Sequence, residues 1–371
     1  MNQPLLRAIF GSITAIVCNA ATAEPLDNLS NGQTGRIEFN ASNPEHRWNL
    51  IRGKLGERQV IFGDLFFPLD STLERFPAVV MSHGSDGITN GMHEVWAKPL
   101  LAAGYAVFMI DSFTPRGSAK IGGTSGQLTW NTTFNISDAI YALRLLTTHP
   151  KIDAKRIYHL GWSRGGNAVT GAMWPNYRYP ITQSEDIRWA GSVAVYPGCN
   201  LRYQNPKLKL TAPVLYLLAE KDDMTPAQPC VEEADLLAAA GNPVRYRVYS
   251  GAYHVFDRPN QSWRQNREGT YARCAIDVVM PEHAKDYSWG PSFHREKKEP
   301  LETPEKWTEA VKACESYQWV TSETHRSARD EAVKETLSFF AASRAMPLRT
   351  DVPNTAGKMT AEEIFRQLNW K

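Results

Sequence analysis

The order of apolar segments restricts this chain to few architectures. From about residue 57, short apolar runs such as residues 78–82 (AVVMS) and 105–110 (YAVFMI) alternate with segments that carry apolar residues at helical spacing, such as residues 134–148. Strands that are apolar throughout are buried on both faces. The pattern therefore predicts an α/β domain in which a mostly parallel sheet is covered by helices on both faces.

The same two patterns predict the remaining elements of the sheet domain. We expect further strands at residues 59–67, 157–160, 193–196, 214–218 and 245–248, and further helices at residues 92–103 and 329–341. In open parallel sheets, reactive groups gather at the carboxyl ends of strands. The residues that directly follow each predicted strand are therefore the first candidates for a functional site.

Ser163 lies in the run GWSRGG (residues 161–166), between the predicted strand at 157–160 and a helix-like run at 167–173. A GxSxG sequence alone arises often by chance, but between a strand and a helix it is typical of a nucleophilic serine on a tight turn. Small neighbours relieve crowding in that turn, and the helix that follows directs its positive end at the reaction centre. Ser163 is therefore the predicted nucleophile.

A serine hydroxyl becomes an effective nucleophile when a base takes its proton. In the chain order serine, acid, histidine, His254 follows the last predicted strand and is the only histidine in the expected interval. The loop after the strand before it contains Asp222 and Asp223, with Glu220 as a more distant choice. The residues themselves leave the identity of the acid open.

A glycine-rich turn, SHGSDG (residues 82–87), follows another predicted strand. A backbone N–H group from this turn and the N–H group of Arg164 are candidates for an oxyanion hole, in which the loss of one donor costs about 10²- to 10³-fold in rate. His83, Asp86 and His93 have no recognised metal-ligand spacing. We therefore predict neither a metal site nor a cofactor.

Five segments together resemble the dienelactone hydrolase family of the α/β-hydrolase superfamily. They are PAVVMSHGSDG, DSFTPRG, GWSRGG, AEKDDMTP and YSGAYHVFD, and they follow the order of that family over roughly residues 57–257. The resemblance implies an α/β-hydrolase fold. It places the acid four residues before a proline, which selects Asp222 by its distance from Pro226, and it places the oxyanion donors on the backbone of Ser85 and Arg164.

The resemblance also indicates a difference in substrate. The type enzyme of the family has a cysteine nucleophile where this chain has Ser163, and a glutamate where it has Gly84. A general ester, lactone or acyl hydrolase is therefore implied, rather than an enzyme for dienelactone itself. Its partner is expected to be a small-molecule ester or lactone.

Three further residues are candidates for substrate binding, each with a structural alternative. Trp162 and Tyr253 flank the nucleophile and the base, where they either shape an apolar acyl pocket or pack in the core. Arg116 in DSFTPRG either faces the pocket and binds a substrate anion or ties loops together.

Residues 1–23 have the features of a signal peptide. Arg7 provides the positive charge, residues 8–17 form a short apolar core, and small residues precede a cleavage site after Ala23. A lipoprotein signal ending at Cys18 is the alternative. The apolar core is shorter than the about 20 residues that a bilayer requires, so we expect a secreted or periplasmic protein without stable membrane insertion.

Removal of the signal peptide leaves four cysteines, an even number that favours disulfides in an exported protein. We expect the pairs Cys199–Cys230 and Cys274–Cys314, because each pair joins neighbouring loops. No CxxC spacing occurs that would indicate a zinc or redox site.

Residues 24–345 are expected to form a single domain. Within it, residues 258–326 are rich in Trp, Tyr, Glu and Lys and look like an irregular insertion, which is either a lid or a surface decoration. Residues 346–371 form a C-terminal extension in which a capping box at Thr360 predicts a short helix.

Composition excludes some function classes. The 371-residue chain has 42% hydrophobic and 22% charged residues and a net charge of +2, with charges of both signs interspersed. This excludes a disordered chain, and without a basic stripe no nucleic-acid partner is expected. A peptidase of the same fold and a non-catalytic exported binding protein are the alternatives to an esterase, and the oligomeric state stays open.

Overall fold

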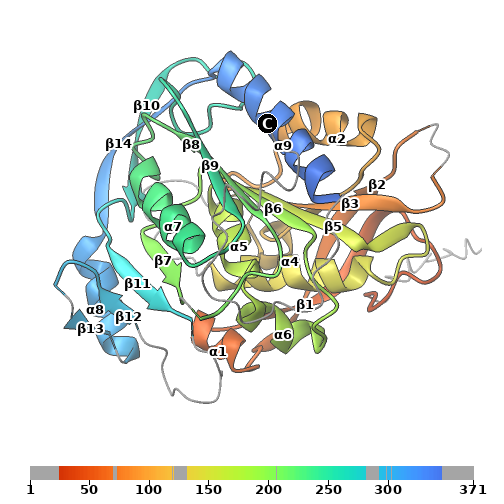
Figure 1. The fold of residues 1–371 in the computed structure, drawn as a ribbon, viewed down its shortest axis with the longest axis horizontal. Helices are drawn as coiled ribbons and strands as arrows, with labels where there is room; N and C mark the ends of the chain where they lie inside the picture. Colours follow the sequence, from red (N-terminus) through yellow and green to blue (C-terminus); the bar gives the residue numbers. More distant parts are fainter. Residues whose placement is uncertain are drawn as a thin grey trace, which may run out of the picture.

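The computed structural model describes residues 25–69, 73–118, 120, 132–205, 207–280, 292–297, 299–301 and 303–344. An eight-stranded sheet in the order β1-β2-β4-β3-β5-β6-β8-β9 forms the centre of this part of the chain (Figure 1). Its strands are β1 (Gly35–Asn43), β2 (Glu57–Phe66), β3 (Phe76–Ser82), β4 (Ala106–Asp111), β5 (Ile152–Trp162), β6 (Gly191–Val195), β8 (Val214–Ala219) and β9 (Val244–Tyr249). Only the pairs β1–β2 and β2–β4 are antiparallel, so the predicted mostly parallel sheet is confirmed.

Helices cover both faces of this sheet, as predicted (Figure 1). They are α1 (Arg47–Ile51), the π-helix η1 (Met92–Ala97), α2 (Lys98–Ala102), the 3₁₀ turn η2 (Thr114–Arg116), α4 (Thr133–Leu146), α5 (Arg164–Ala172), α6 (Pro175–Thr182), α7 (Ala227–Ala239) and α9 (Arg326–Arg344). Successive side chains of β3 point to opposite faces of the sheet. Val80 belongs to a buried cluster with Ile140 of α4, and Val79 belongs to a second cluster with Phe339 of α9. The whole strand is buried, which explains its continuous apolar sequence.

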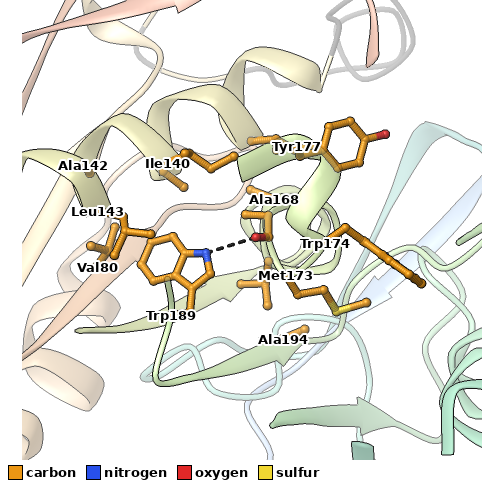
Figure 2. Packing of buried hydrophobic residues seen from close by; sticks show 14 of the residues in the cluster. Val80, Ile140, Ala142, Leu143, Ala168, Met173, Trp174, Tyr177, Trp189 and Ala194 are labelled. Atoms are coloured by element: carbon orange, nitrogen blue, oxygen red, sulfur yellow. Dashed lines mark hydrogen bonds between the residues drawn. The ribbon is translucent and has the colours of Figure 1, made fainter. Parts of the chain in front are cut away.

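Figure 2 shows part of the cluster that fixes α5 against the sheet. Trp189 shares this cluster with Ile140 and Leu143 of α4, and its indole Nε1 donates a hydrogen bond of 3.1 Å to the carbonyl oxygen of Ala172 at the end of α5. Because α5 begins directly after Ser163, this packing also positions the predicted nucleophile.

The predicted strands and helices of the sheet domain all coincide with elements of the structure. Sequence analysis missed β1, although its buried residues Ile37, Phe39 and Ala41 stand at every second position. The predicted signal peptide (1–23) and the C-terminal helix lie outside the described residues. Among the described helices, none is both long and apolar enough to cross a membrane.

The insertion, residues 258–326, is more ordered than its composition suggested. It contains β10 (Arg264–Thr270), β11 (Ile276–Val279), β12 (Ser292–His294), β13 (Glu299–Pro300), α8 (Pro304–Cys314) and β14 (Ser316–Ser322). Strands β10 and β14 pair as an antiparallel ribbon, and β11 to β13 extend β7 (Leu201–Gln204) into a second small sheet. The expectation of an irregular segment is therefore wrong for its described residues, because alternating polar strands carry no continuous apolar signal.

Candidate active site

Ser163 lies on a sharp turn between β5 and α5. Its backbone adopts φ 50° and ψ −114°, a strained conformation for a residue other than glycine. A Cβ atom on Gly161 would come within 2.2 Å of the Gly165 carbonyl oxygen, and one on Gly165 within 1.9 Å of the Ser82 carbonyl oxygen. The two flanking glycines of the motif are therefore required by close backbone packing.

The structure brings Ser163, His254 and Asp222 together in one chain of hydrogen bonds. His254 Nε2 lies 3.1 Å from Ser163 Oγ, and His254 Nδ1 lies 2.7 Å from Asp222 Oδ2. These side chains come from the carboxyl ends of β5, β8 and β9, which meet at one edge of the parallel sheet. The imidazole and the carboxylate are both largely buried.

The loop between β8 and α7, residues 220–226 (the acid loop), holds the Asp222 carboxylate in one orientation. Its Oδ1 accepts hydrogen bonds from the backbone N–H groups of Met224 at 3.0 Å and Thr225 at 2.8 Å, while the Thr225 hydroxyl lies 3.0 Å from its Oδ2. These donors leave Oδ2 directed at His254 Nδ1. The loop therefore fixes the geometry of the carboxylate before any substrate arrives.

The other two acid candidates bind elsewhere. The Asp223 carboxylate accepts the backbone N–H of Thr321 in β14, at 2.9 and 3.0 Å. The Glu220 carboxylate accepts hydrogen bonds from Gly251 N and Ser250 Oγ in the loop before His254, and these bonds lower its pKa. Of the three acids, Asp222 is the one bonded to the imidazole.

The glycine-rich turn, residues 82–87, lies against Ser163. A Cβ atom on Gly84 would lie 3.5 Å from the Ser163 Cβ, and Ser85 is buried beside it, with its Oγ 3.4 Å from Arg164 Nε. His83 anchors the turn: its Nε2 accepts the backbone N–H of Ser112 at 3.1 Å, so its Nδ1 carries the proton and donates to the Gly84 carbonyl oxygen at 2.7 Å. Burial lowers the pKa of His83 and keeps it neutral.

Two cavities border this centre, and both are lined by Ser85, Ser163 and Met224. The first cavity has a volume of about 140 Å³ and is also lined by Trp162, Tyr196, His254, Asp86, Asp257, Arg258, Arg264, Asn266 and Glu268. The second has a volume of about 300 Å³ and is also lined by Arg47, Thr132, Arg164, Asn167, Asn200, Thr225, Thr270, Tyr271, Trp307 and Val311. Residues of the insertion thus form walls of both cavities.

The three predicted substrate-binding residues have different surroundings. Trp162 lines the first cavity and packs edge-to-face on Trp96. Tyr253 lines neither cavity, and its ring lies beside the ammonium group of Lys221.

The interpretation of Arg116 as an anion-binding residue is not supported, because its guanidinium is already occupied. It forms a bidentate ion pair with the buried carboxylate of Asp138 at 2.8 and 2.9 Å. It also donates to Asn43 Oδ1 and to the Ser112 carbonyl oxygen. The alternative, in which Arg116 ties loops together, matches these contacts.

Sequence analysis missed Tyr196, which follows β6 at the carboxyl edge of the sheet. Its ring packs against the imidazole of His254 at 4.8 Å between centroids, and its hydroxyl donates a 2.6 Å hydrogen bond to Asp257. Asp257 also accepts the indole N–H of Trp96 at 2.7 Å. The usable signal was its position at the carboxyl end of the predicted strand 193–196. The residues of β10 that line the first cavity gave no such signal, because that strand is polar.

Both predicted disulfides are formed. Cys199–Cys230 links the loop after β6 to α7, and Cys274–Cys314 links the segment after β10 to the end of α8. The segments that they join carry residues of the second cavity. Among the described residues, no group of His, Cys, Asp or Glu side chains has the arrangement of a metal site.

Similarities to solved structures are weak. A protein from Klebsiella pneumoniae assigned as a dienelactone hydrolase is 17% identical, covers 60% of this chain and 88% of its own, and has a TM-score of 0.43. The esterase Est2 of the planctomycete Thermogutta terrifontis with bound butyrate is 15% identical, with coverages of 53% and 80% and a TM-score of 0.41. At these values neither likeness supports a conclusion about substrate or mechanism.

The sequence itself carries the family assignment. No curated protein matches the chain significantly. A sequence model of the dienelactone hydrolase family matches residues 65–279, a stretch that makes up more than half of the chain and contains Ser163, Asp222 and His254. The chain therefore belongs to the dienelactone hydrolase family, and it is a carboxylic ester hydrolase.

Proposed function

We propose that this protein is an exported serine esterase in which Ser163 is the nucleophile, His254 the general base and Asp222 the acid that orients it. One observation carries this proposal: the hydrogen bonds of 2.7 and 3.1 Å that connect Asp222, His254 and Ser163 beside two cavities. Activation of a serine requires a base within hydrogen-bond reach and a third group that orients the base.

The reaction proceeds in two halves. His254 Nε2 takes the proton from Ser163 Oγ as this oxygen bonds to the ester carbonyl carbon, and the backbone N–H groups of Ser85 and Arg164 stabilise the oxyanion. The bond from carbon to the alcohol oxygen then breaks, and His254 returns the proton to the leaving alcohol. In the second half, His254 deprotonates a water molecule that attacks the acyl-serine, which releases the carboxylic acid and restores Ser163.

Asp222 does not take up the proton during this cycle. It accepts the Nδ1–H group of His254, which keeps Nε2 free to act as a base and stabilises the imidazolium that forms. The two cavities that Ser163 lines would hold the acyl and alcohol halves of the ester. Linear esters and lactones both fit this scheme.

Export is part of the proposal. The signal-like features of residues 1–23 favour it, and so do two disulfides, since these bonds persist mainly in oxidising compartments. Sequencing the N-terminus of protein recovered from the periplasm or the medium tests it, and a mature start at Glu24 is the expected result.

The decisive test of the catalytic role compares Ser163→Ala with Ser85→Ala. Ser163→Ala should lower kcat for 4-nitrophenyl acetate by about 10⁴-fold or more and abolish labelling by a fluorophosphonate probe. Ser85→Ala keeps the backbone donor and should cost less than about tenfold. Wild-type protein that is neither labelled nor active would indicate a binding protein, and cleavage of peptides without cleavage of esters would indicate a peptidase.

A further inference from the structure

The two cavities beside Ser163 differ in their contact with the base. His254 lines the first cavity and is not among the described residues that line the second. In the proposed reaction, His254 Nε2 returns the proton to the alcohol oxygen as the ester bond breaks. The alcohol half therefore leaves on the side of His254, which makes the first cavity the place where it binds.

Three of the charged side chains of the first cavity have partners within the protein. Arg258 forms an ion pair with Asp86. The carboxylate of Asp257 accepts the Tyr196 hydroxyl at 2.6 Å and the indole N–H of Trp96 at 2.7 Å. The strongest interactions of these groups are thus made inside the protein, and the part of the wall that is available to a ligand lies elsewhere.

Strand β10 supplies that part of the wall. Arg264, Asn266 and Glu268 line the cavity from alternate positions of the strand, so their side chains point to one face. Within the described part of the chain, the half-buried Glu268 side chain has no hydrogen bond or ion pair. Arg264 has one long hydrogen bond, of 3.4 Å from Nε to Ser322 Oγ. The row therefore presents a guanidinium, an amide and a carboxylate to the cavity.

Glu268 has lost part of its hydration at this position. Burial raises the pKa of its carboxyl, and the negative charge of Asp86 adds to this shift while Arg264 opposes it. A carboxylate that loses water without gaining a donor is stabilised by a hydrogen-bond donor from a ligand. A hydroxyl group is such a donor, and unlike an ammonium group it brings no positive charge toward Arg264 and Arg258.

The chemistry of this wall separates three classes of alcohol. An apolar alcohol would displace water from ionised side chains without replacing its hydrogen bonds, which is unfavourable. A charged alcohol would meet a like charge, because guanidinium groups and carboxylates line the same cavity. Each hydroxyl of a neutral polyol both donates and accepts, so one molecule can donate to Glu268 and accept from Arg264 or Asn266. The volume of about 140 Å³ suits a small polyol rather than a long chain.

We propose that the first cavity binds a neutral polyol or a single sugar ring as the alcohol half of the substrate, so that the enzyme is an esterase for acylated polyols. Glu268 is the main specificity-determining residue, and Arg264 and Asn266 act with it. This inference rests on the proposed esterase function of Ser163 and names the substrate class of the same site.

The first experiment compares acetate esters whose alcohol halves have a similar size but differ in hydroxyl groups. 1-O-Acetylglycerol is paired with 2-methylbutyl acetate, and 6-O-acetylglucose is paired with cyclohexylmethyl acetate. Wild-type kcat/KM should be about 10- to 100-fold higher for the hydroxylated ester in at least one pair. Acetylcholine and 4-acetoxybutyrate, whose alcohol halves carry a positive and a negative charge, should both react more slowly than the better hydroxylated ester.

The second experiment tests Glu268. Glu268→Met should lower kcat/KM for the hydroxylated ester by about tenfold, mainly through KM, because the accepting carboxylate is lost. The same variant should raise kcat/KM for the apolar ester of the pair, since that alcohol no longer displaces water from a charge. Glu268→Gln retains one acceptor and should keep part of the preference, and it serves as the test if Glu268→Met fails to fold.

Arg267→Met is the matched control. Arg267 is the neighbouring residue of β10, is exposed, and points to the opposite face of the strand. The substitution should therefore leave kcat/KM for both esters of a pair at the values of wild type.

Equal kcat/KM values within both pairs of wild-type measurements, or a preference for the apolar or charged esters, would overturn this inference while the esterase function stood. Wild-type protein that hydrolyses none of these esters, nor 4-nitrophenyl acetate, would instead overturn the proposed function. A preference that is unchanged in both Glu268→Met and Glu268→Gln would contradict the role assigned to Glu268.

Discussion

Asp222 and Asp223 are adjacent in the chain, yet their carboxylates bind different parts of the molecule. Asp222 is bonded to the imidazole of His254, whereas Asp223 accepts the backbone N–H of Thr321 in the insertion. The Asp223 carbonyl oxygen also accepts the side-chain amide of Gln318 in β14. The acid loop therefore connects the candidate triad to the wall of the first cavity.

This division predicts different effects for the two matched substitutions. Asp222→Asn presents an amide to His254 Nδ1 and favours the wrong tautomer, so kcat should fall by about 10³- to 10⁴-fold. Asp223→Asn keeps an acceptor for Thr321 and should cost less than about tenfold in kcat. Steady-state kinetics with 4-nitrophenyl acetate check both variants, and equal losses would contradict the assignment of the acid.

The turn glycines give a prediction about stability. Gly165→Ala would place a Cβ atom 1.9 Å from the Ser82 carbonyl oxygen, so backbone atoms must move and the free energy of unfolding should fall by about 3 kcal/mol. At Gly198 the added atom would meet its nearest neighbour at 3.5 Å, an ordinary contact, so Gly198→Ala should unfold like wild type. Urea denaturation compares the two, and an unaffected Gly165→Ala would show that the turn is looser than described.

The predictable part of the site consisted of side chains with strong local constraints. Ser163 stands between a strand and a helix with glycines that tolerate the close approach, and His254 follows the last strand of the sheet. Parallel strands bring their carboxyl ends to one edge, so local patterns were enough to predict this convergence.

The residues that the sequence did not reveal depend on pairing between distant segments. Strand β10 carries Arg264, Asn266 and Glu268 at alternate positions facing the first cavity, but its partner β14 lies some fifty residues later. A polar strand has no hydrophobic period by which to recognise it. For Arg116 the sequence left two interpretations open, a pocket residue or a tie between loops, and its ion pair with the buried carboxylate of Asp138 favours the second.

The disulfides are expected to stabilise the fold and the second cavity together. Each disulfide, Cys274–Cys314 and Cys199–Cys230, restricts the unfolded chain. Each should therefore add about 2–4 kcal/mol to the free energy of unfolding. Dithiothreitol should therefore lower the midpoint of urea unfolding in wild type. The double variant Cys274→Ser/Cys314→Ser should be less stable than wild type before reduction, and dithiothreitol should lower its midpoint of urea unfolding by less. A midpoint that does not change on verified reduction of both bonds would contradict this expectation.

A buried histidine in the central sheet predicts acid sensitivity of the fold. His159 in β5 stacks on Trp189 at 4.6 Å between centroids, and its Nε2 lies 2.9 Å from Ser82 Oγ. Burial lowers the pKa of its imidazole from the ordinary value of 6.5 to about 3. Between these two values the unfolded chain binds a proton that the folded protein does not, so stability is complete above about pH 6.5 and declines as the pH falls toward 3.

The substitution His159→Gln should remove this contribution. Between pH 7 and pH 5, wild type should lose about 2 kcal/mol more of its free energy of unfolding than the variant, because the slope approaches about 1.4 kcal/mol per pH unit for one proton. Ser82→Ala keeps the imidazole and should retain the slope of wild type, although it removes the hydrogen bond and lowers stability at every pH. Urea titrations at several pH values measure the slopes. If His159→Gln and wild type lose stability in parallel, the imidazole is protonated in the folded protein and the burial argument is wrong.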